Sequence, residues 1–252
     1  MSTPDLDPVI RAVSAASRVA RQAAAERADL ADLLKDDKSP VTVADLAVQV
    51  AVTAALRAAD VPHADRLVGE EGADSLDAGG TTMIEQLLRL SGEALDAAGL
   101  GHAAPTSEGS LRELLDAAGL DPVEEGRETF WCLDPIDGTK GFLRGQQFAI
   151  ALGLVTGSEP RIGLLGCPHL ALGIRHDYGD ADEVGSIYLG VIGEGAWSGP
   201  TTAASRADLA PTAVSPEPPD GRVRVCLSYE KAHSDTDRTS AALEAAGVRT
   251  TP

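Results

Sequence analysis

The run WCLDPIDGTKGFLR, residues Trp131–Arg144, is the most informative part of this sequence. It opens with three apolar residues and then places two carboxylates, Asp134 and Asp137, three positions apart. Gly138 and Thr139 follow, and the next four residues fit a short helical turn. The pattern predicts a buried strand that ends in a sharp turn, with two acids at the tip of the strand.

The chemistry of this run suits a metal ion and a phosphate. Mg²⁺ prefers oxygen ligands in a near-octahedral arrangement, and two Asp side chains with the Ile136 carbonyl between them supply part of that shell. The backbone N–H groups of Gly138 and Thr139, at the start of a helical turn, suit a phosphate. An ordinary turn is the alternative, because Asp-Pro and Asp-Gly are common turn dipeptides. Taken alone, the run favours the turn, so the choice rests on the rest of the chain.

Composition and charge limit the classes of partner. The chain has 252 residues, enough to bury a sizeable core, and its 43% hydrophobic and 24% charged residues are ordinary for a globular protein. Acids outnumber bases 39 to 21, which gives a net charge of −18. This balance argues against a nucleic-acid polymer or an anionic membrane surface as partner. A small phosphorylated substrate stays compatible, because bound divalent cations invert the local charge. We expect a monomer or a small homo-oligomer.

The cysteines and the N-terminus predict a cytoplasmic protein. Cys132, Cys167 and Cys226 are widely spaced, odd in number and set in apolar surroundings, with no zinc-binding spacing. They are typical of buried thiols in a reducing compartment. The first ten residues, MSTPDLDPVI, are acidic and lack the pattern of a signal peptide. No run approaches ~18 uninterrupted apolar residues, so no membrane span is predicted.

The N-terminal part of the chain has helical periodicity. An Ala-rich pattern predicts a helix over Leu6–Leu34, and a second helix is predicted over Val43–Ala59. Thr42 is a candidate N-cap for the second helix, which places Asp45 in its first turn. An acid there complements the helix dipole, so Asp45 has a structural explanation as well as a functional one.

A short strand is predicted next, followed by a helical region without a catalytic pattern. Arg66–Gly69 fits a strand, and it ends in Glu70-Glu71-Gly72, which suits either an exposed turn or a ligand site. Helices are predicted over Thr82–Ala98 and Leu111–Ala118. We interpret residues 73–126 as surface or accessory structure.

After the central run the period changes to that of strands. Residues 199–221 are predicted to form a loop, and Ser234–Ala246 a helix with Leu243 and Ala246 facing inward. Helices leading and strands following predict an α+β architecture with a largely antiparallel sheet. The predicted strands are Phe148–Val155, Arg161–Gly166, Ala171–Arg175, Ser186–Ile192 and Arg222–Leu227.

Four fragments together carry a resemblance to a known family. They are SPVTVAD (Ser39–Asp45), VGEE (Val68–Glu71), WCLDPIDGTKGFLRG (Trp131–Gly145) and YEKAHSDTD (Tyr229–Asp237). The chain resembles the inositol monophosphatase-like superfamily of metal-dependent, lithium-sensitive phosphatases, and is most similar to its 3′(2′),5′-bisphosphate nucleotidase branch. That resemblance implies a phosphatase of sulfate assimilation that removes the 3′-phosphate from 3′-phosphoadenosine 5′-phosphate, giving AMP and phosphate.

The resemblance also implies a metal site for Mg²⁺. Glu70, Asp134 and Asp137 would bind the metal through their carboxylates, and Ile136 would bind it through its carbonyl oxygen. Two metal ions can clamp the attacking and the leaving oxygen of a phosphate ester and lower the pKa of the attacking water.

Catalytic and substrate-binding roles follow from the same resemblance. Asp45 and Thr139 would orient and activate the attacking water, a relay of the general acid–base kind. Gly138 and Thr139 would bind the scissile phosphate through their N–H groups. His233 and Ser234 would help to hold the nucleotide, although a lone His near a helix start is also typical of a cap or of the surface.

The implied fold is a layered α-β-α-β sandwich of the sugar-phosphatase type. We expect residues 1–198 to form an N-terminal α+β lobe with the metal and phosphate site, and residues 199–252 to begin a C-terminal α/β lobe that is incomplete. Members of the branch continue into a Trp-Asp-His-Ala-type motif whose Asp binds the second metal, and the 252 residues contain no match to it.

Three hypotheses of function stay open at this stage. The first is a Mg²⁺-dependent bisphosphate nucleotidase. The second is another phosphatase of the superfamily, acting on an inositol phosphate or a sugar bisphosphate. The third is a catalytically impaired protein that binds metal or nucleotide without turnover.

Overall fold

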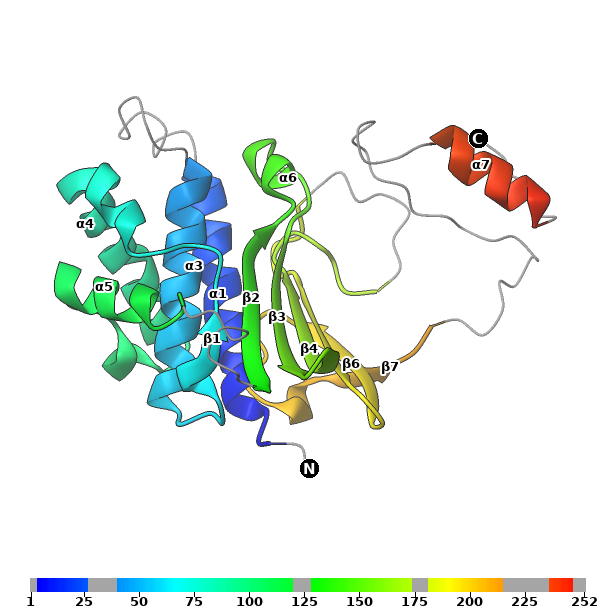
Figure 1. The fold of residues 1–252 in the computed structure, drawn as a ribbon, viewed down its shortest axis with the longest axis horizontal. Coiled ribbons are helices and arrows are strands. Elements are labelled where there is room, and N and C mark those ends of the chain that lie inside the picture. The colour runs from blue at the N-terminus through cyan, green and yellow to red at the C-terminus, as the bar shows by residue number, and fades with distance from the viewer. Residues whose placement is uncertain (1–3, 27–39, 120–127, 174–180, 215–235, 247–252) are drawn as a thin grey trace. The chain divides into compact units, whose positions relative to one another are not determined.

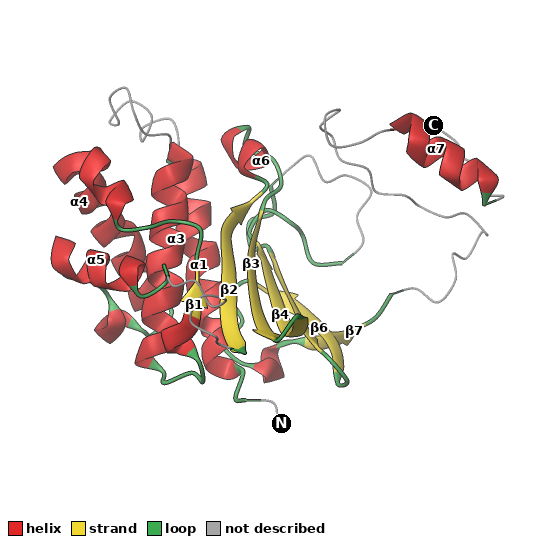
Figure 2. Cartoon of the chain, in the orientation of Figure 1, coloured by secondary structure: helices red, strands yellow, loops and turns green. Residues whose placement is uncertain are grey.

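The chain is mainly helical in its first half and mainly β in its second half, as a computed structural model shows (Figures 1 and 2). The structure describes residues 4–26, 40–119, 128–173, 181–214 and 236–246. Contacts divide the chain into two units, Met1–Thr212 and Ala213–Pro252. The predicted division into lobes at residues 198 and 199 stays a prediction.

The predicted helices are present with changed bounds. In the first unit the structure has α1 (Asp7–Ala25), α3 (Pro40–Ala58), α4 (Asp74–Ala97), α5 (Glu108–Asp116) and α6 (Thr139–Leu143), with short 3-10 turns at Ala64–Arg66, Gly101–Ala103 and Arg206–Asp208. Helix α4 begins eight residues before its predicted start at Thr82, and it contains a kink at Gly80, where φ is 64°. Within the described residues, no helix has the length and apolar character that a membrane span requires.

The predicted N-cap of α3 is wrong. The helix begins at Pro40, so Thr42 lies inside it. Proline is tolerated in a first helical turn, because the N–H that it lacks would have had no partner within the helix. No acid lies in the first turn of α3, and Asp45 comes later in the helix with 8% of its surface exposed. The interpretation that Asp45 complements the dipole of α3 from its first turn is therefore wrong.

The strands form one sheet in chain order, β1-β2-β3-β4-β5-β6-β7. Strand β1 is parallel to β2, and every other neighbouring pair is antiparallel, so the prediction of a largely antiparallel sheet is confirmed. The strands are β1 (Leu67–Val68), β2 (Thr129–Asp137), β3 (Ala149–Thr156), β4 (Glu159–Cys167), β5 (Ser186–Val191), β6 (Gly195–Pro200) and β7 (Ala210–Thr212).

Some strand predictions are wrong. Residues 171–173 form no strand, while the rest of predicted strand Ala171–Arg175 and all of Arg222–Leu227 lie outside the described residues. Strands β6 and β7 were not predicted, and β7 falls inside the expected loop 199–221. Their sequences, GAWSGP and APT, are poor in β-branched residues. The pairing of β6 with β5 and of β7 with β6 supplies what local propensity does not.

The second unit contains the predicted C-terminal helix, α7 (Thr236–Ala245). Leu243 is half-buried, but Ala246 is exposed, so the prediction that both face inward is wrong for Ala246. The N–H of Ala246 still donates to the Ala242 carbonyl at 3.0 Å, as in a helix, but its side chain lies in solvent.

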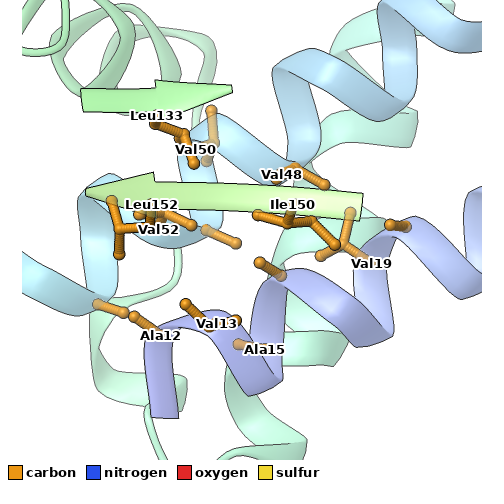
Figure 3. Packing of buried hydrophobic residues seen from close by; sticks show 14 of the residues in the cluster. Ala12, Val13, Ala15, Val19, Val48, Val50, Val52, Leu133, Ile150 and Leu152 are labelled. Carbon is orange, nitrogen blue, oxygen red and sulfur yellow. The ribbon is translucent and has the colours of Figure 1, made fainter. Parts of the chain in front are cut away.

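Helices α1 and α3 pack on one face of the sheet, and α4 and α5 pack on α3 (Figure 1). Figure 3 shows Val13 and Val19 of α1 beside Val48 of α3, with Ile150 and Leu152 of β3 between the helices and the sheet. All five side chains are at most 1% exposed. Burial of such side chains contributes roughly 1.5–3 kcal/mol each and fixes where α3 lies against β2.

The other face of the sheet carries a row of small residues. Neighbouring strands place Cys132 opposite Gly153, Gly153 opposite Gly163, Gly163 opposite Gly190, and Gly190 opposite Ala196. Because three consecutive strands present no side chain in this row, the face is hollowed into a groove of about 830 Å³. We call it the open groove; it extends from Glu70 and Asp134 to Trp197 and Thr212.

Candidate active site

The end of β2 carries the two predicted metal-binding acids. Asp134 lies opposite Ala151 of β3 and Asp137 opposite Ala149, so three steps along β2 match two along β3. This β-bulge bends the strand and re-aims its side chains. Ile136 is 2% exposed, whereas Asp134 and Asp137 lie on the surface. The predicted strand with acids at its tip is therefore confirmed.

The turn after β2 explains the glycines of the central run. Gly138 has a φ of 89°, a conformation that strains any residue with a Cβ atom, and it precedes the five-residue helix α6. A Cβ atom at Gly141 would overlap the carbonyl oxygen of Gln147, so the backbone of α6 can approach that carbonyl only with glycine. The Thr139 hydroxyl donates to the Ile136 carbonyl at 3.3 Å, which connects a predicted catalytic residue with a predicted metal ligand.

The segment after α6 is attached to the loop after β4. The Gln147 side-chain amide donates to the His169 carbonyl at 3.1 Å, and the His169 ring Nδ1 lies 3.0 Å from the Gln146 carbonyl oxygen. The Phe148 ring packs edge-on against both Phe142 and His169, with centroid distances of 5.2 and 4.8 Å. These contacts fix the position of α6 relative to the sheet.

Helix α3 approaches the site from the other side with Asp45 and Gln49, one helical turn apart. Gln49 is fully buried, and its Oε1 accepts the backbone N–H groups of Glu70 and Glu71, both at 3.1 Å. Its Nε2 donates to the Glu71 carbonyl at 2.6 Å. The Glu71 carboxylate accepts the Ser75 hydroxyl at 2.9 Å, so the two neighbouring glutamates have different environments.

The acids from three segments repel one another. Burial, followed by the charges of Glu70, Glu71 and Asp134, raises the pKa of Asp45 to about 8. Burial and then Asp134 and Glu71 raise the pKa of Glu70 above its ordinary value. The pKa of Asp134 is likewise raised, first by burial and then by Asp137. Helix α3, the loop after β1 and the end of β2 thus share one negative region.

Two cysteines lie in the same part of the sheet as free thiols. Burial and then the nearby charge of Asp137 raise the pKa of Cys167 to about 11, so this thiol stays protonated at neutral pH. Cys132 is half-buried, and its pKa is also raised, mainly by burial. Cys226 lies outside the described residues.

The donor set fits a hard divalent cation in its chemistry. Carboxylates and a backbone carbonyl are the ligands that Mg²⁺ prefers, and unneutralised negative charge is a shared cause of the raised pKa values of Asp45, Glu70 and Asp134. Across the described ranges, however, no three Asp, Glu, His or Cys side chains surround a common point as ligands. Binding of a cation would therefore require these exposed side chains to rotate toward it.

Comparison with known proteins identifies the family. The sequence signature of the Inositol monophosphatase family matches residues 5–249. The chain belongs to this family. The match includes the end of β2, the loop after β1 and the part of α3 that carries Asp45, so the negative region lies within the residues that match the family.

Relatives within the inositol monophosphatase family have more specific names. The chain is 32% identical to a 3′(2′),5′-bisphosphate nucleotidase 1 of Arabidopsis thaliana over 98% of its own length and 70% of the relative's. It is 32% identical to the enzyme so named in Emericella nidulans, over 85% of the chain and 63% of the relative. A Schizosaccharomyces pombe relative of the same name is 37% identical over 64% of the chain and 45% of the relative.

Solved structures of the family are more distant. An inositol monophosphatase II from Staphylococcus aureus MSSA476 is 19% identical, with a TM-score of 0.40 over 74% of this chain and 46% of that one. CysQ from Bacteroides thetaiotaomicron, described as a bacterial member of the inositol monophosphatase family, is 19% identical, with a TM-score of 0.36 over 75% of this chain and 47% of that one.

The structure brings four predicted site residues of this family member into one region: Asp45, Glu70, Asp134 and Asp137, which interact through their charges. Thr139 and Gly138 follow directly, and α6 contacts α3. His233 and Ser234 lie outside the described residues. The ligand and catalytic roles of all these residues stay predictions.

The sequence analysis did not predict the contact of Gln49 with the loop after β1. It also did not predict that Glu71 binds Gln49 through its backbone and Ser75 through its carboxylate. The signal for Gln49 was its spacing, since residues four apart on a helix share a face with each other and Asp45 was already a candidate. The signal for the loop was Gly69, where a Cβ atom would overlap the Gln49 side chain. Neither the spacing of Gln49 nor the glycine at position 69 predicts which groups form the hydrogen bonds; that requires the tertiary structure.

Proposed function

We propose that this chain is a Mg²⁺-dependent phosphatase that removes the 3′-phosphate from 3′-phosphoadenosine 5′-phosphate, giving AMP and phosphate. The observation that carries the proposal is the negative region beside the open groove. Glu70 and Asp134 line the end of the groove, and after burial their charges raise the pKa of the neighbouring Asp45. Relatives named 3′(2′),5′-bisphosphate nucleotidase support the choice of substrate. Since the chain spans less than two thirds of most of these relatives, the activity itself is part of the proposal.

Glu70, Asp134 and Asp137 would hold Mg²⁺ through their carboxylates, and Ile136 through its carbonyl. When bound, Mg²⁺ supplies positive charge that neutralises the phosphate and lowers the pKa of the attacking water. A carbonyl oxygen has two lone pairs, so the hydrogen bond from Thr139 to Ile136 leaves one for a cation.

Asp45 and Thr139 would activate the water. Burial and then the charges of neighbouring acids raise the pKa of Asp45. Bound cations would offset the charges and so favour the ionised carboxylate, which can accept a proton. Thr139 is held next to the acids by the turn at Gly138. Its one hydroxyl proton is donated to the Ile136 carbonyl, so in the relay the hydroxyl would turn to donate that proton to Asp45 while it accepts one from the water. Such a relay requires that α6 and α3 lie in contact, as they do.

Substrate binding would use the start of α6 and the open groove. The backbone N–H groups of Gly138 and Thr139 would bind the scissile phosphate, and His233 and Ser234 would help to hold the nucleotide. The groove begins beside Glu70 and Asp134, so it offers space next to the acids for the rest of a substrate molecule.

Two further properties belong to the proposal. Inhibition by lithium and a role in sulfate assimilation follow from the family resemblance. A cytoplasmic location is supported by the free thiols of Cys132 and Cys167, which suit a reducing compartment.

A phosphate-release assay tests the proposal. The chain is incubated with 3′-phosphoadenosine 5′-phosphate, inositol 1-phosphate or fructose 1,6-bisphosphate, each with Mg²⁺ or with EDTA. We expect release that depends on Mg²⁺ and is fastest from the nucleotide. Faster release from inositol 1-phosphate would favour a second function, which the family's name also supports. No release from any of them, with Mg²⁺ binding retained, would indicate a binding protein.

Variants at the end of β2 assign the metal ligands. Asp134→Asn and Asp137→Asn should each reduce Mg²⁺-dependent release by more than about 100-fold, because each removes a charged ligand. Asp116→Asn, at the exposed end of α5, is the matched control and should leave the rate unchanged. Full activity in either β2 variant would remove that residue from the site.

A further inference from the structure

Gln49 is a buried polar residue whose entire side-chain amide serves one loop. It is 0% exposed in the middle of α3, and its Oε1 accepts the N–H groups of Glu70 and Glu71 while its Nε2 donates to the Glu71 carbonyl. A buried amide without partners costs roughly 1–3 kcal/mol, so a side chain placed this deep fixes the backbone that satisfies it.

Gly69 makes this contact achievable. A Cβ atom at position 69 would overlap both the oxygen and the carbon of the Gln49 amide, so only glycine lets the loop backbone come this close. The N–H of Gly69 also donates to the Ala118 carbonyl at 2.7 Å, which anchors the start of the loop to the end of α5. The loop is thus held from two sides.

The Glu70–Glu71 loop has to be held in place because its negative charges lie near the acids at the end of β2. Glu70 and Asp134 both line the same end of the open groove, and Glu71 is the next residue of the loop, so like charges meet here. This repulsion pushes Glu70 away from the end of β2 whenever no cation is bound. The three hydrogen bonds from Gln49 counteract that push without adding a charge.

We propose that Gln49 is a positioning residue of the candidate metal site: it holds the Glu70–Glu71 backbone so that the Glu70 carboxylate stays within reach of a divalent cation at Asp134. This inference rests on the proposed function, since it takes the end of β2 to be the cation site. Gln49 itself touches neither cation nor substrate.

The amide group is the chemistry that this role requires. It offers an acceptor for two N–H groups and a donor for one carbonyl, and it stays neutral at every pH at which the acids titrate. Glutamate at position 49 would lose the donor and add a negative charge beside Asp45. Methionine would keep the volume and lose all three hydrogen bonds.

Mg²⁺ titration calorimetry on the full chain tests the inference, with Gln49→Met as the variant and Thr53→Val as the matched control. Thr53 is 1% exposed and lies one turn further along α3, and its hydroxyl donates to the Gln49 backbone carbonyl at 2.7 Å. We expect Gln49→Met to weaken Mg²⁺ binding by about 10- to 100-fold, as loss of a group that orients a ligand does. Thr53→Val should stay within about threefold of the wild type.

Amide hydrogen exchange of Glu70 and Glu71 gives a second readout that does not depend on Mg²⁺. Both amides should exchange faster in Gln49→Met and at the wild-type rate in Thr53→Val. The rate of phosphate release by Gln49→Met should recover at saturating Mg²⁺, whereas a general structural defect would lower the rate at every Mg²⁺ concentration. Should Gln49→Met fail to fold, Gln49→Asn, which keeps the amide but shortens its reach, takes its place.

The outcomes separate this inference from the proposed function. If the wild type binds Mg²⁺ and Gln49→Met binds it equally well, or if the Glu70 and Glu71 amides are unchanged, the positioning role is wrong and the phosphatase proposal stands. If the wild type binds Mg²⁺ but releases no phosphate, the phosphatase proposal fails while a weakened Gln49→Met still supports the role. If the wild type binds no Mg²⁺, both are wrong.

Discussion

At the scale of single residues, Asp45 differs most from what its sequence position suggests. An aspartate near a helix start is usually explained by the helix dipole, but α3 begins at Pro40 and leaves Asp45 buried beyond the first turn. Its pKa of about 8 shows that burial and the neighbouring acids make ionisation costly in the folded chain. A residue that destabilises the fold in this way is typical of a functional site.

The pH dependence of stability follows from the direction of that shift. The folded pKa of about 8 lies above the ordinary aspartate pKa of 3.8, so between these pH values the folded chain binds a proton that the unfolded chain has released. The free energy of unfolding therefore falls as pH rises through this window. We expect metal-free Asp45→Asn to match the wild type near pH 4 and to exceed its stability at pH 8 by on the order of 5 kcal/mol.

Urea unfolding in EDTA at several pH values measures this difference. Asparagine keeps the volume of the side chain and cannot ionise, so the two proteins differ only in the titrating proton. Parallel stability curves for wild type and Asp45→Asn would show that Asp45 ionises freely in the folded chain. In the phosphate-release assay the same variant should be inactive, because it lacks the proton acceptor.

At the scale of elements, the position of α6 depends on glycine and on the segment that follows it. Helix α6 has only five residues, too few to be stable alone, and it is fixed by close backbone contact with Gln147. Phe142 inserts its fully buried ring beside Phe148 and so attaches the helix to β3. The predicted phosphate-binding N–H groups are therefore held by packing and not by the helix itself.

Substitutions of two helical glycines should have opposite effects. Gly141→Ala places a methyl group against the Gln147 carbonyl and should destabilise the chain by roughly 1–3 kcal/mol, with a loss of phosphatase activity. Gly92→Ala, inside α4, meets no atom within 4 Å and should stabilise it by about 0.5–1 kcal/mol. Thermal unfolding of both variants, followed by circular dichroism, measures the contrast. Equal destabilisation by both would show that the approach of Gln147 to α6 is not restrictive.

At the scale of the whole molecule, the chain has a large net negative charge, and part of that charge is concentrated at the candidate site. The chain has a net charge of −18, and four of its acids crowd the end of β2 and the loop beside it. A cation that binds there removes repulsion that the folded chain bears and the unfolded chain does not. Binding of the proposed metal would therefore be coupled to folding.

Mg²⁺ should raise the thermal stability of the chain for this reason. At 100 times its Kd, a ligand that binds only the folded state adds about 2.7 kcal/mol, which corresponds to a Tm increase of at least about 5 °C for a domain of this size. Differential scanning calorimetry in Mg²⁺ and in NaCl of equal ionic strength measures the effect. The increase should be absent from Asp134→Asn, and an equal increase in NaCl would reduce the effect to general screening of charge.

Much of this protein can be read from its sequence. The helices before β2, the antiparallel strands after it and the acids at its tip follow from periodicity and from the run Trp131–Arg144. The family follows from this run together with three other short fragments. These features are local, because hydrophobic period, glycine and closely spaced carboxylates act on neighbouring residues. Strands β6 and β7 were not predictable in this way, since their pairing partner and not their composition makes them strands.

The tertiary structure alone decided how the acids are held. Sequence placed Asp45, Glu70 and Asp134 in separate segments, and only packing of α3 against β2 brings their charges within reach of one another. The structure also showed that the Gln49 side chain binds the backbone of Glu70 and Glu71. These residues lie 21 and 22 positions from Gln49, so no local pattern specifies the contact. The sequence by itself determined which residue types form the site. The repulsion between the acids and the hydrogen bonds that hold their loop are properties of the folded chain, because both depend on distance in space.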